Sequence, residues 1–124
     1  MIELNLSNQD GFLRNWNITK TFIKNGLGPY LCKHDCFLNY LNIFGCCIGF
    51  QGLYELVPAL KKNKSLLVLN IGNNLLNGDL SARKIVTILN SCKNLLELDI
   101  SENLLKSKGA SQIITALCEV NKEQ

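Results

Sequence analysis

The chain of 124 residues is poor in the residue types that mark several classes of protein. Arginine occurs only at Arg14 and Arg83 and the net charge is +3, so we expect no clustered basic face and no nucleic-acid partner. His34 is the one histidine, and the sequence has no glycine-rich motif that could cradle a phosphate. Nucleophilic catalysis therefore lacks its usual parts, and we predict a chain that is not an enzyme and uses no cofactor.

Long apolar runs are also missing. No stretch reaches the roughly 18 residues that a membrane-spanning helix requires, so we expect no membrane contact. The first ten residues show neither the basic start nor the apolar core of a secretion signal. We therefore expect a cytoplasmic or other intracellular protein, in which the six cysteines are free thiols unless they bind a metal.

Aliphatic residues and asparagine dominate the composition. The chain has 23 leucines, 11 isoleucines and 16 asparagines. This apolar content excludes a disordered chain, because enough aliphatic surface is available to form a core. The length fits a single domain, since one hydrophobic core usually serves about 100–150 residues.

The aliphatic residues recur in a pattern that is present three times without a gap. In each copy, leucines at the first and fourth positions precede isoleucine at the sixth, asparagine or cysteine at the ninth and an aliphatic residue at the eleventh. The copies begin 28 and then 29 residues apart. They are Leu38-x-x-Leu41-x-Ile43-x-x-Cys46-x-Ile48, Leu66-x-x-Leu69-x-Ile71-x-x-Asn74-x-Leu76 and Leu95-x-x-Leu98-x-Ile100-x-x-Asn103-x-Leu105.

The first half of each copy predicts a strand. Leucine and isoleucine alternate there with period 2, which is typical of a strand with one buried face. Strands that all run in one direction, each returned by a helix, must pair in parallel. We therefore expect an α/β solenoid with a curved parallel sheet on its concave side and helices on its convex side.

The second half of each copy predicts the helix. After Gly52, Ser81 and Gly109, aliphatic residues follow at +4 and +8, the spacing of one helical stripe. Leu80 or Ser81 stands where glycine is expected, in a turn one residue longer, and Ser81 is the predicted N-cap of its helix. The last helix is predicted over about residues 109–120.

This pattern resembles the leucine-rich repeat, specifically the ribonuclease-inhibitor type with 28–29 residues and a full helix in each repeat. The resemblance implies a single domain over residues 1–124. Three full repeats would span 38–65, 66–94 and 95–120, with an irregular N-terminal repeat over 1–37 that carries an insertion and a tail over 121–124. It also implies that Cys46, Asn74 and Asn103 point inward and form a ladder that satisfies backbone groups of neighbouring turns.

The first 37 residues fit the pattern less well. Leu4-x-Leu6-x-x-Gln9 copies the strand and the ladder position, but it precedes the next strand by too many residues. We predict a surface loop over 8–17 and a short helix over 18–25 that buries Ile18 and Phe22, with Trp16 as a further candidate for burial. Gly26 would end this helix as a left-handed cap, and Gly28-Pro29 would stop any continuation.

One local cluster contains residues that can ligate a metal. The motif Cys32-x-His34-x-Cys36 is followed ten residues later by the dipeptide Cys46-Cys47. An adjacent pair does not match the spacing of paired cysteines in zinc sites, so free thiols are the favoured interpretation, with a metal site and a disulfide as alternatives. We predict no metal. Cys92 and Cys118 fall on helical segments and are predicted to be small buried apolar residues.

The outward positions of the predicted strands form the candidate partner-binding surface. No lysine or arginine falls on the four strands, whereas four acids do: Glu3, Glu97, Asp99 and Glu102. Helix dipoles and solubility could explain this distribution without any binding, and Tyr40 and Phe44 could simply cover the sheet beneath the N-terminal insertion. The functional interpretation is an adaptable surface for a protein segment with some positive charge. Its residues would be Tyr40, Asn42, Phe44, Val68, Asn70, Glu97, Asp99 and Glu102.

Binding to other proteins is therefore the function that we expect. The chain would be an adaptor or structural subunit of a larger intracellular assembly, with cytoskeletal and ciliary assemblies among those that the resemblance implies. A protein partner should cover one or both ends of the solenoid, because a terminal repeat leaves an apolar side and an unpaired strand edge. The alternative is a regulatory protein of the GTPase-activating or enzyme-inhibitor type, in which Arg83 would be the candidate stabilising cation.

Overall fold

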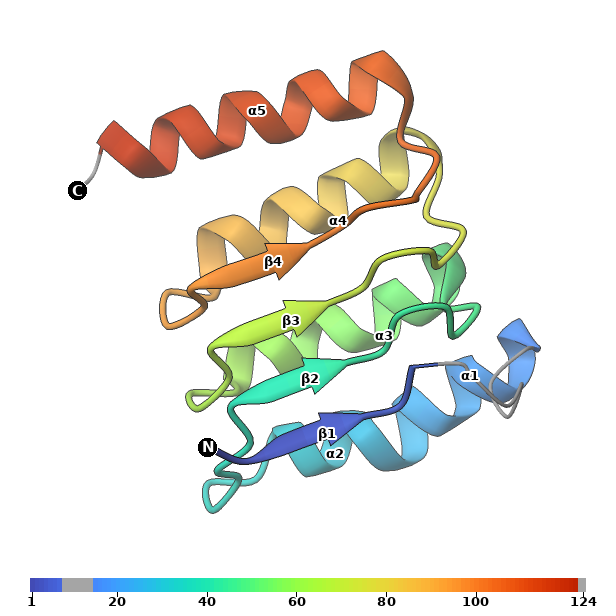
Figure 1. Ribbon diagram of the computed structural model, residues 1–124, viewed down its shortest axis with the longest axis vertical. Helices are drawn as coiled ribbons and strands as arrows, with labels where there is room; N and C mark the ends of the chain where they lie inside the picture. Colours follow the sequence, from blue (N-terminus) through green and yellow to red (C-terminus); the bar gives the residue numbers. More distant parts are fainter. Residues whose placement is uncertain (8–14, 123–124) are drawn as a thin grey trace.

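The computed structural model describes residues 1–7 and 15–122 and shows a mixed α/β fold (Figure 1). Four short strands form one parallel sheet in the order β1-β2-β3-β4, so neighbours in sequence are neighbours in the sheet. The strands are β1 (Glu3–Asn5), β2 (Tyr40–Asn42), β3 (Val68–Asn70) and β4 (Glu97–Asp99). The predicted parallel sheet is confirmed, and the architecture is consistent with a leucine-rich-repeat-like fold.

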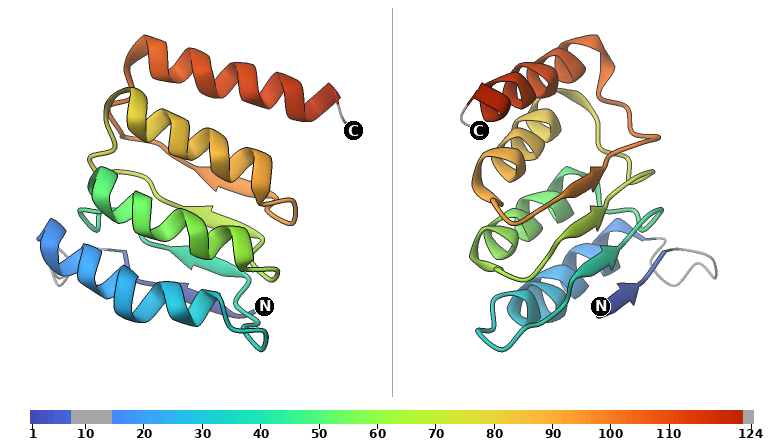
Figure 2. Two further views of the ribbon diagram at one scale, coloured as in Figure 1. Left: turned by 180° about the vertical axis from the view of Figure 1, so that it is seen from behind. Right: turned by 60° about the vertical axis from the view of Figure 1, so that its left-hand side comes forward.

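The helices form a second layer on one side of the sheet (Figure 2). A helical run made of α1 (Trp16–Phe22), η1 (Ile23–Leu27) and α2 (Gly28–Leu31) connects β1 to β2. The later helices are α3 (Gly49–Lys62), α4 (Gly78–Ser91) and α5 (Lys106–Lys122). Each connecting helix returns the chain to the start of the next strand, as parallel pairing requires. Within the described residues, no helix combines the length and the apolar composition needed to cross a bilayer.

The strand register aligns the repeated leucines across the sheet. Leu4, Leu41, Leu69 and Leu98 are paired in turn, and Leu41 and Leu69 are fully buried. Successive residues of a strand point to opposite faces, so the central residue of each strand faces the helices. Burial of these aliphatic side chains provides the main stabilising contribution. Other large, fully buried side chains from both layers include Leu31, Leu53, Leu56, Ile71, Ile85 and Ile88.

The N-terminal helical segment differs from the prediction in its length and in the residues that it buries. Helical backbone runs without interruption from Trp16 to Leu31, through a π-helical turn at η1. Ile18 is 52% exposed, so its predicted burial is wrong. The buried side chains are four residues apart on one stripe: Thr19, Ile23, Leu27 and Leu31. The predicted ladder position of Gln9 and most of the predicted loop over 8–17 lie outside the described residues.

A buried hydrogen bond explains which side of this helical segment faces the core, and a π-helical turn allows the helical backbone to continue. The Thr19 hydroxyl donates to the carbonyl oxygen of Cys46 at 2.6 Å, which directs the Thr19 stripe towards the core. Gly26 is not a left-handed cap, because the chain continues through the π-helical turn. Pro29 occupies the first turn of α2, where its missing N–H and fixed φ are tolerated. A Cβ on Gly28 would lie 2.8 Å from the carbonyl oxygen of Ile23, so glycine is required at this turn.

Two predicted helix starts are also corrected. α4 begins at Gly78, directly after the extended residue Asn77, so Ser81 is a buried residue inside the helix and not its N-cap. Gly78 has a φ of +73°, which glycine adopts readily, and the turn into the helix is therefore completed earlier than the repeat spacing suggests. α5 begins at Lys106, ahead of the predicted start at residue 109.

Candidate functional site

Asn74 lies at the centre of a row of inward-facing side chains behind the strand ends. Its Oδ1 accepts hydrogen bonds from the backbone N–H groups of Cys46 (2.8 Å) and Ile48 (3.2 Å). Its Nδ2 donates to the carbonyl oxygens of Ile43 (2.8 Å) and Gly72 (2.9 Å). The side chain is fully buried, so water cannot replace it as the partner of these backbone groups; among the described residues, only the Gly72 carbonyl oxygen has a second donor, the backbone N–H of Gly45 at 3.0 Å.

Asn103 and Cys46 occupy the corresponding places on either side of Asn74. The Oδ1 of Asn103 accepts from the backbone N–H groups of Asn74 (2.9 Å) and Leu76 (3.1 Å). The Cys46 thiol donates to the carbonyl oxygen of Leu6, with an S···O distance of 3.0 Å. Burial raises the pKa of the Cys46 thiol to about 11, which keeps it protonated at neutral pH. We refer to Cys46, Asn74 and Asn103 as the inner ladder.

A second set of side chains closes a turn at the end of each strand. Asn5, Asn42, Asn70 and Asp99 are paired in turn across the sheet. Each accepts a hydrogen bond through its Oδ1 from the backbone N–H two residues further on, with N···O distances between 2.9 and 3.0 Å. These contacts are Asx turns. Asn42, Asn70 and Asp99, which the sequence suggested as partner contacts, therefore also shape the strand ends.

Asp99 offers a test of this turn through its ionisation. The hydroxyl of Ser101, and then its backbone N–H, hold the pKa of the Asp99 carboxyl below its usual value of 3.8. A depressed folded-state pKa gives stability that is present above the unfolded pKa and is lost as pH falls through the folded pKa. Asp99→Asn introduces the asparagine that the other three strands carry at this position. We expect this variant to preserve the turn and to lose less stability at low pH than the unaltered protein. Urea unfolding at about pH 3 and about pH 7 measures it, and an unchanged pH dependence would contradict this role.

The surface of the sheet that faces away from the helices, here called the sheet face, has a row of side chains with an apolar centre and an acid at each end. Tyr40 and Val68 are paired in the register and are half-buried, and the next residue in the row, Glu97, is exposed. Phe44 covers the backbone beyond β3, because a Cβ on Gly72 would lie only 2.8 Å from the Phe44 ring. The sheet face thus joins a partly apolar centre to a charged edge.

Acidic residues occupy both outer strands of the sheet. Glu3 lies on β1, and Glu97 and Asp99 lie on β4, all exposed. Glu102 does not belong to a strand, because β4 ends at Asp99 and Glu102 lies in the following turn with a φ of 57°. Its predicted place among the strand residues is therefore wrong. The four described strands contain no lysine or arginine.

The cysteine and histidine cluster is spread over different surroundings. Cys32 and His34 are exposed, whereas Cys36 is buried. Across residues 1–7 and 15–122, no three His, Cys, Asp or Glu side chains are grouped so that they could hold a metal ion. The six cysteines are free thiols. Cys118 is exposed and Cys92 is only half-buried, so the predicted burial of Cys118 is wrong; α5 is the outermost helix and has a neighbouring helix on one side only (Figure 1).

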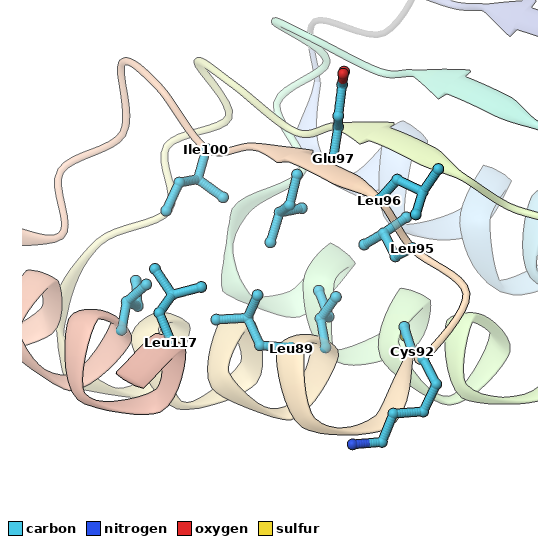
Figure 3. A pocket seen from close by; sticks show the side chains of 11 residues that line it. Leu89, Cys92, Leu95, Leu96, Glu97, Ile100 and Leu117 are labelled. Atoms are coloured by element: carbon cyan, nitrogen blue, oxygen red, sulfur yellow. The ribbon is translucent and has the colours of Figure 1, made fainter. Parts of the chain in front are cut away.

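An apolar groove of about 450 Å³ lies beside β4 at the end of the sheet (Figure 3). Its walls come from α4, from the segment 95–100 and from α5. Glu97 points away from the aliphatic side chains that line it (Figure 3). The contribution of Leu89 and Cys92 to this groove depends on how α4 packs against α5, so it could not be found from the spacing of the repeat. The main apolar lining residues are Leu89, Cys92, Leu95, Leu98, Ile100 and Leu117.

Comparisons with known proteins identify the fold and assign no family. No protein family and no curated protein sequence matches the chain. Among solved structures, the one titled "Leiomodin-1 Actin-Binding Site 2 (ABS2)" is similar to it, with a TM-score of 0.70 over 96% of this chain at 19% sequence identity. This chain spans 65% of the length of that structure. At this level of identity the similarity shows a shared fold.

Proposed function

We propose that this chain is a non-catalytic protein-interaction module of the leucine-rich-repeat class. Its repeats, of the ribonuclease-inhibitor type, would be 38–65, 66–94 and 95–120, with an irregular N-terminal repeat over 1–37. Cys46, Asn74 and Asn103 would form the structural ladder of this solenoid. The protein would act inside the cell as an adaptor or structural subunit.

The sheet face is the proposed binding surface. The observation that carries this proposal is the row Tyr40-Val68-Glu97, in which half-buried apolar side chains adjoin an exposed acid. Asp99 adds a second exposed carboxylate on the same strand, and the four described strands carry no positive side chain. Such a surface suits a partner segment that combines an apolar residue with positive charge.

A cytoskeletal partner is the specific form of this proposal. The similar solved structure is titled as an actin-binding site of leiomodin-1. It shares its fold with 96% of the chain described here. Actin is therefore the first partner to test. Because fold alone does not determine function, the test must include variants of the sheet face.

Co-sedimentation with actin filaments, and sedimentation with monomeric actin, test the proposal. We expect binding by the unaltered chain and at least about fivefold weaker binding by Tyr40→Ala and by Glu97→Lys, since each alters the proposed contact row. Gln51→Lys is the matched control, because Gln51 is exposed on α3 in the helix layer. If the chain bound neither actin filaments nor monomeric actin, actin would be rejected as its partner. Equal binding by all variants would reject the sheet face.

The regulatory alternative depends on Arg83. Its guanidinium pairs with the carboxylate of Asp79 at 3.0 Å, one turn earlier on α4, and its side chain is 68% exposed. This places Arg83 in the helix layer, away from the sheet face. Stimulation of a GTPase by this chain that is lost in Arg83→Ala would replace the non-catalytic proposal.

A further inference from the structure

The repeated aliphatic side chains become more exposed to solvent from β3 to β4, at the end of the sheet. Leu41 and Leu69 are fully buried, whereas Leu98, at the equivalent place on β4, is half-buried. In the helix layer, Leu60 on α3 is 3% exposed and Leu117, at the equivalent place on α5, is 43% exposed. The apolar groove therefore occupies the place that a following strand fills beside β2 and beside β3.

The turn after β4 also presents backbone groups in the arrangement that the turns after the earlier strands offer to their neighbours. The Oδ1 of Asn74 accepts from the N–H groups of Cys46 and Ile48, and the Oδ1 of Asn103 accepts from those of Asn74 and Leu76. The next N–H groups in this series are those of Asn103 and Leu105. An added parallel strand that carried asparagine at the same position would bring an acceptor to both. Edge strands are common sites for such strand addition.

Charge argues against a second copy of this chain as the added strand. Glu3 on β1 and Glu97 on β4 belong to the same row, Glu3-Tyr40-Val68-Glu97. If β1 of a second copy continued the sheet in this register, its Glu3 would lie beside Glu97. Like charges at directly opposed positions of neighbouring strands are destabilising, whereas opposite charges are favourable. A lysine opposite Glu97 and another opposite Asp99 would therefore suit this edge.

We propose that the apolar groove and the edge of β4 bind an extended segment of a separate partner protein, which adds a fifth parallel strand to the sheet. Its aliphatic residues would lie opposite Leu95, Leu98 and Ile100, and its lysines opposite Glu97 and Asp99. An asparagine opposite Asn103 would continue the inner ladder. The recognised motif is Leu-x-Lys-Leu-Lys-Ile-x-x-Asn. This inference goes beyond the proposed function, because it concerns the end of the sheet and does not require a partner on the centre of the sheet face.

Fluorescence anisotropy with two labelled peptides tests this site on the full chain. The first peptide carries the motif with serine at each variable position, and the second carries glutamate in place of both lysines. We expect the lysine peptide to bind about tenfold more tightly, from the sum of two opposite-charge pairs and the absence of two like-charge pairs. Glu97→Lys should reduce this preference at least about fivefold. Equal binding of the two peptides, or binding of neither, would overturn the proposal.

A pair of variants on α5 locates the binding. Leu117 lines the groove and is 43% exposed, whereas Ile114 is 60% exposed on the same helix and does not line it. We expect Leu117→Lys to lose peptide binding at least about tenfold and Ile114→Lys to retain it, while both variants fold. Equal effects of the two substitutions would overturn the assignment to the groove. Tyr40→Ala should leave peptide binding unchanged, so this site and the sheet face are tested separately.

Two further measurements identify the occupant and its direction. A nitroxide at the N-terminus of the bound peptide should broaden the amide signal of Leu96 more than that of Ser101, because a parallel strand starts near Leu96. The reverse order would overturn the parallel arrangement. Sedimentation velocity of the chain alone should show a monomer, and a dimer that Leu117→Lys abolishes would replace the separate partner with a second copy.

Discussion

Asn74→Ala is expected to lower the free energy of unfolding by about 3 kcal/mol. The side chain serves two buried N–H groups and two carbonyl oxygens, and alanine can replace none of these contacts. A buried backbone group that loses its partner costs about 1–3 kcal/mol, and relaxation or an entering water reduces the sum. Urea unfolding followed by circular dichroism measures the change.

Two other asparagines calibrate this result. Asn103 makes comparable contacts but is half-buried, so water can replace part of them and Asn103→Ala should cost about 1–2 kcal/mol. Asn90 is exposed on α4, and Asn90→Ala should change stability by less than about 0.5 kcal/mol. If Asn74→Ala were no more destabilising than Asn90→Ala, the inner ladder would not be a stabilising element.

Leu69→Ala is expected to destabilise the protein by about 3–4 kcal/mol, more than twice as much as Leu98→Ala. The two leucines are direct partners in the register, but Leu69 is fully buried and Leu98 is half-buried beside the groove. Truncation of Leu69 removes contacts on all sides and leaves a cavity, whereas truncation of Leu98 widens an existing opening. Denaturant unfolding of both variants provides the comparison.

The peptide proposed for the β4 edge supplies an internal control for this pair. When the peptide is bound, the difference between Leu69→Ala and Leu98→Ala should narrow, because Leu98 then has apolar neighbours on both sides. Equal losses in the free protein would show instead that β4 is covered without any added strand.

The parallel sheet could be predicted from the sequence because its signal is local and repeated. The alternation of Leu41 with Ile43 recurs at Leu69 and at Leu98, and a helical stripe follows each strand. Those two periodicities determine which side chains face inward, and they require the same direction for every strand. The asparagines of the inner ladder could also be identified from their repeated position. The backbone groups to which each one is hydrogen-bonded could not, because they depend on the conformation of the neighbouring turn.

The N-terminal helix could not be placed from its local pattern. Ile18 and Phe22 form an apolar pair at helical spacing, yet the buried stripe passes through Thr19, whose hydroxyl is satisfied by the Cys46 carbonyl oxygen 27 residues away. Gly26 and Pro29 have strong preferences for helix ends, but a π-helical turn accommodates both. A tertiary contact therefore explains which stripe is buried, and a close local approach of Gly28 to Ile23 accompanies the turn.

Parts of the candidate site were also beyond the sequence. Outward positions such as Asn42 and Asn70 suit contact with a partner, and their role in Asx turns is seen only when the distance to the second following N–H is known. The groove beside β4 combines residues from two helices and a strand, so its lining depends on how α5 packs.

The decrease in burial from β3 to β4 predicts that the β4–α5 layer opens more readily under thermal fluctuation than the layers of β2 and β3. Each strand–helix layer is held by its neighbours, and the β4–α5 layer has a neighbour on one side only (Figure 1). We expect the amide hydrogens of this layer to exchange with solvent through fraying that does not open β2 and β3. A ligand bound to β4 would join the β4–α5 layer to the other strands of the sheet in one cooperative unit. Binding at the edge of the sheet would therefore also reduce motion two strands away.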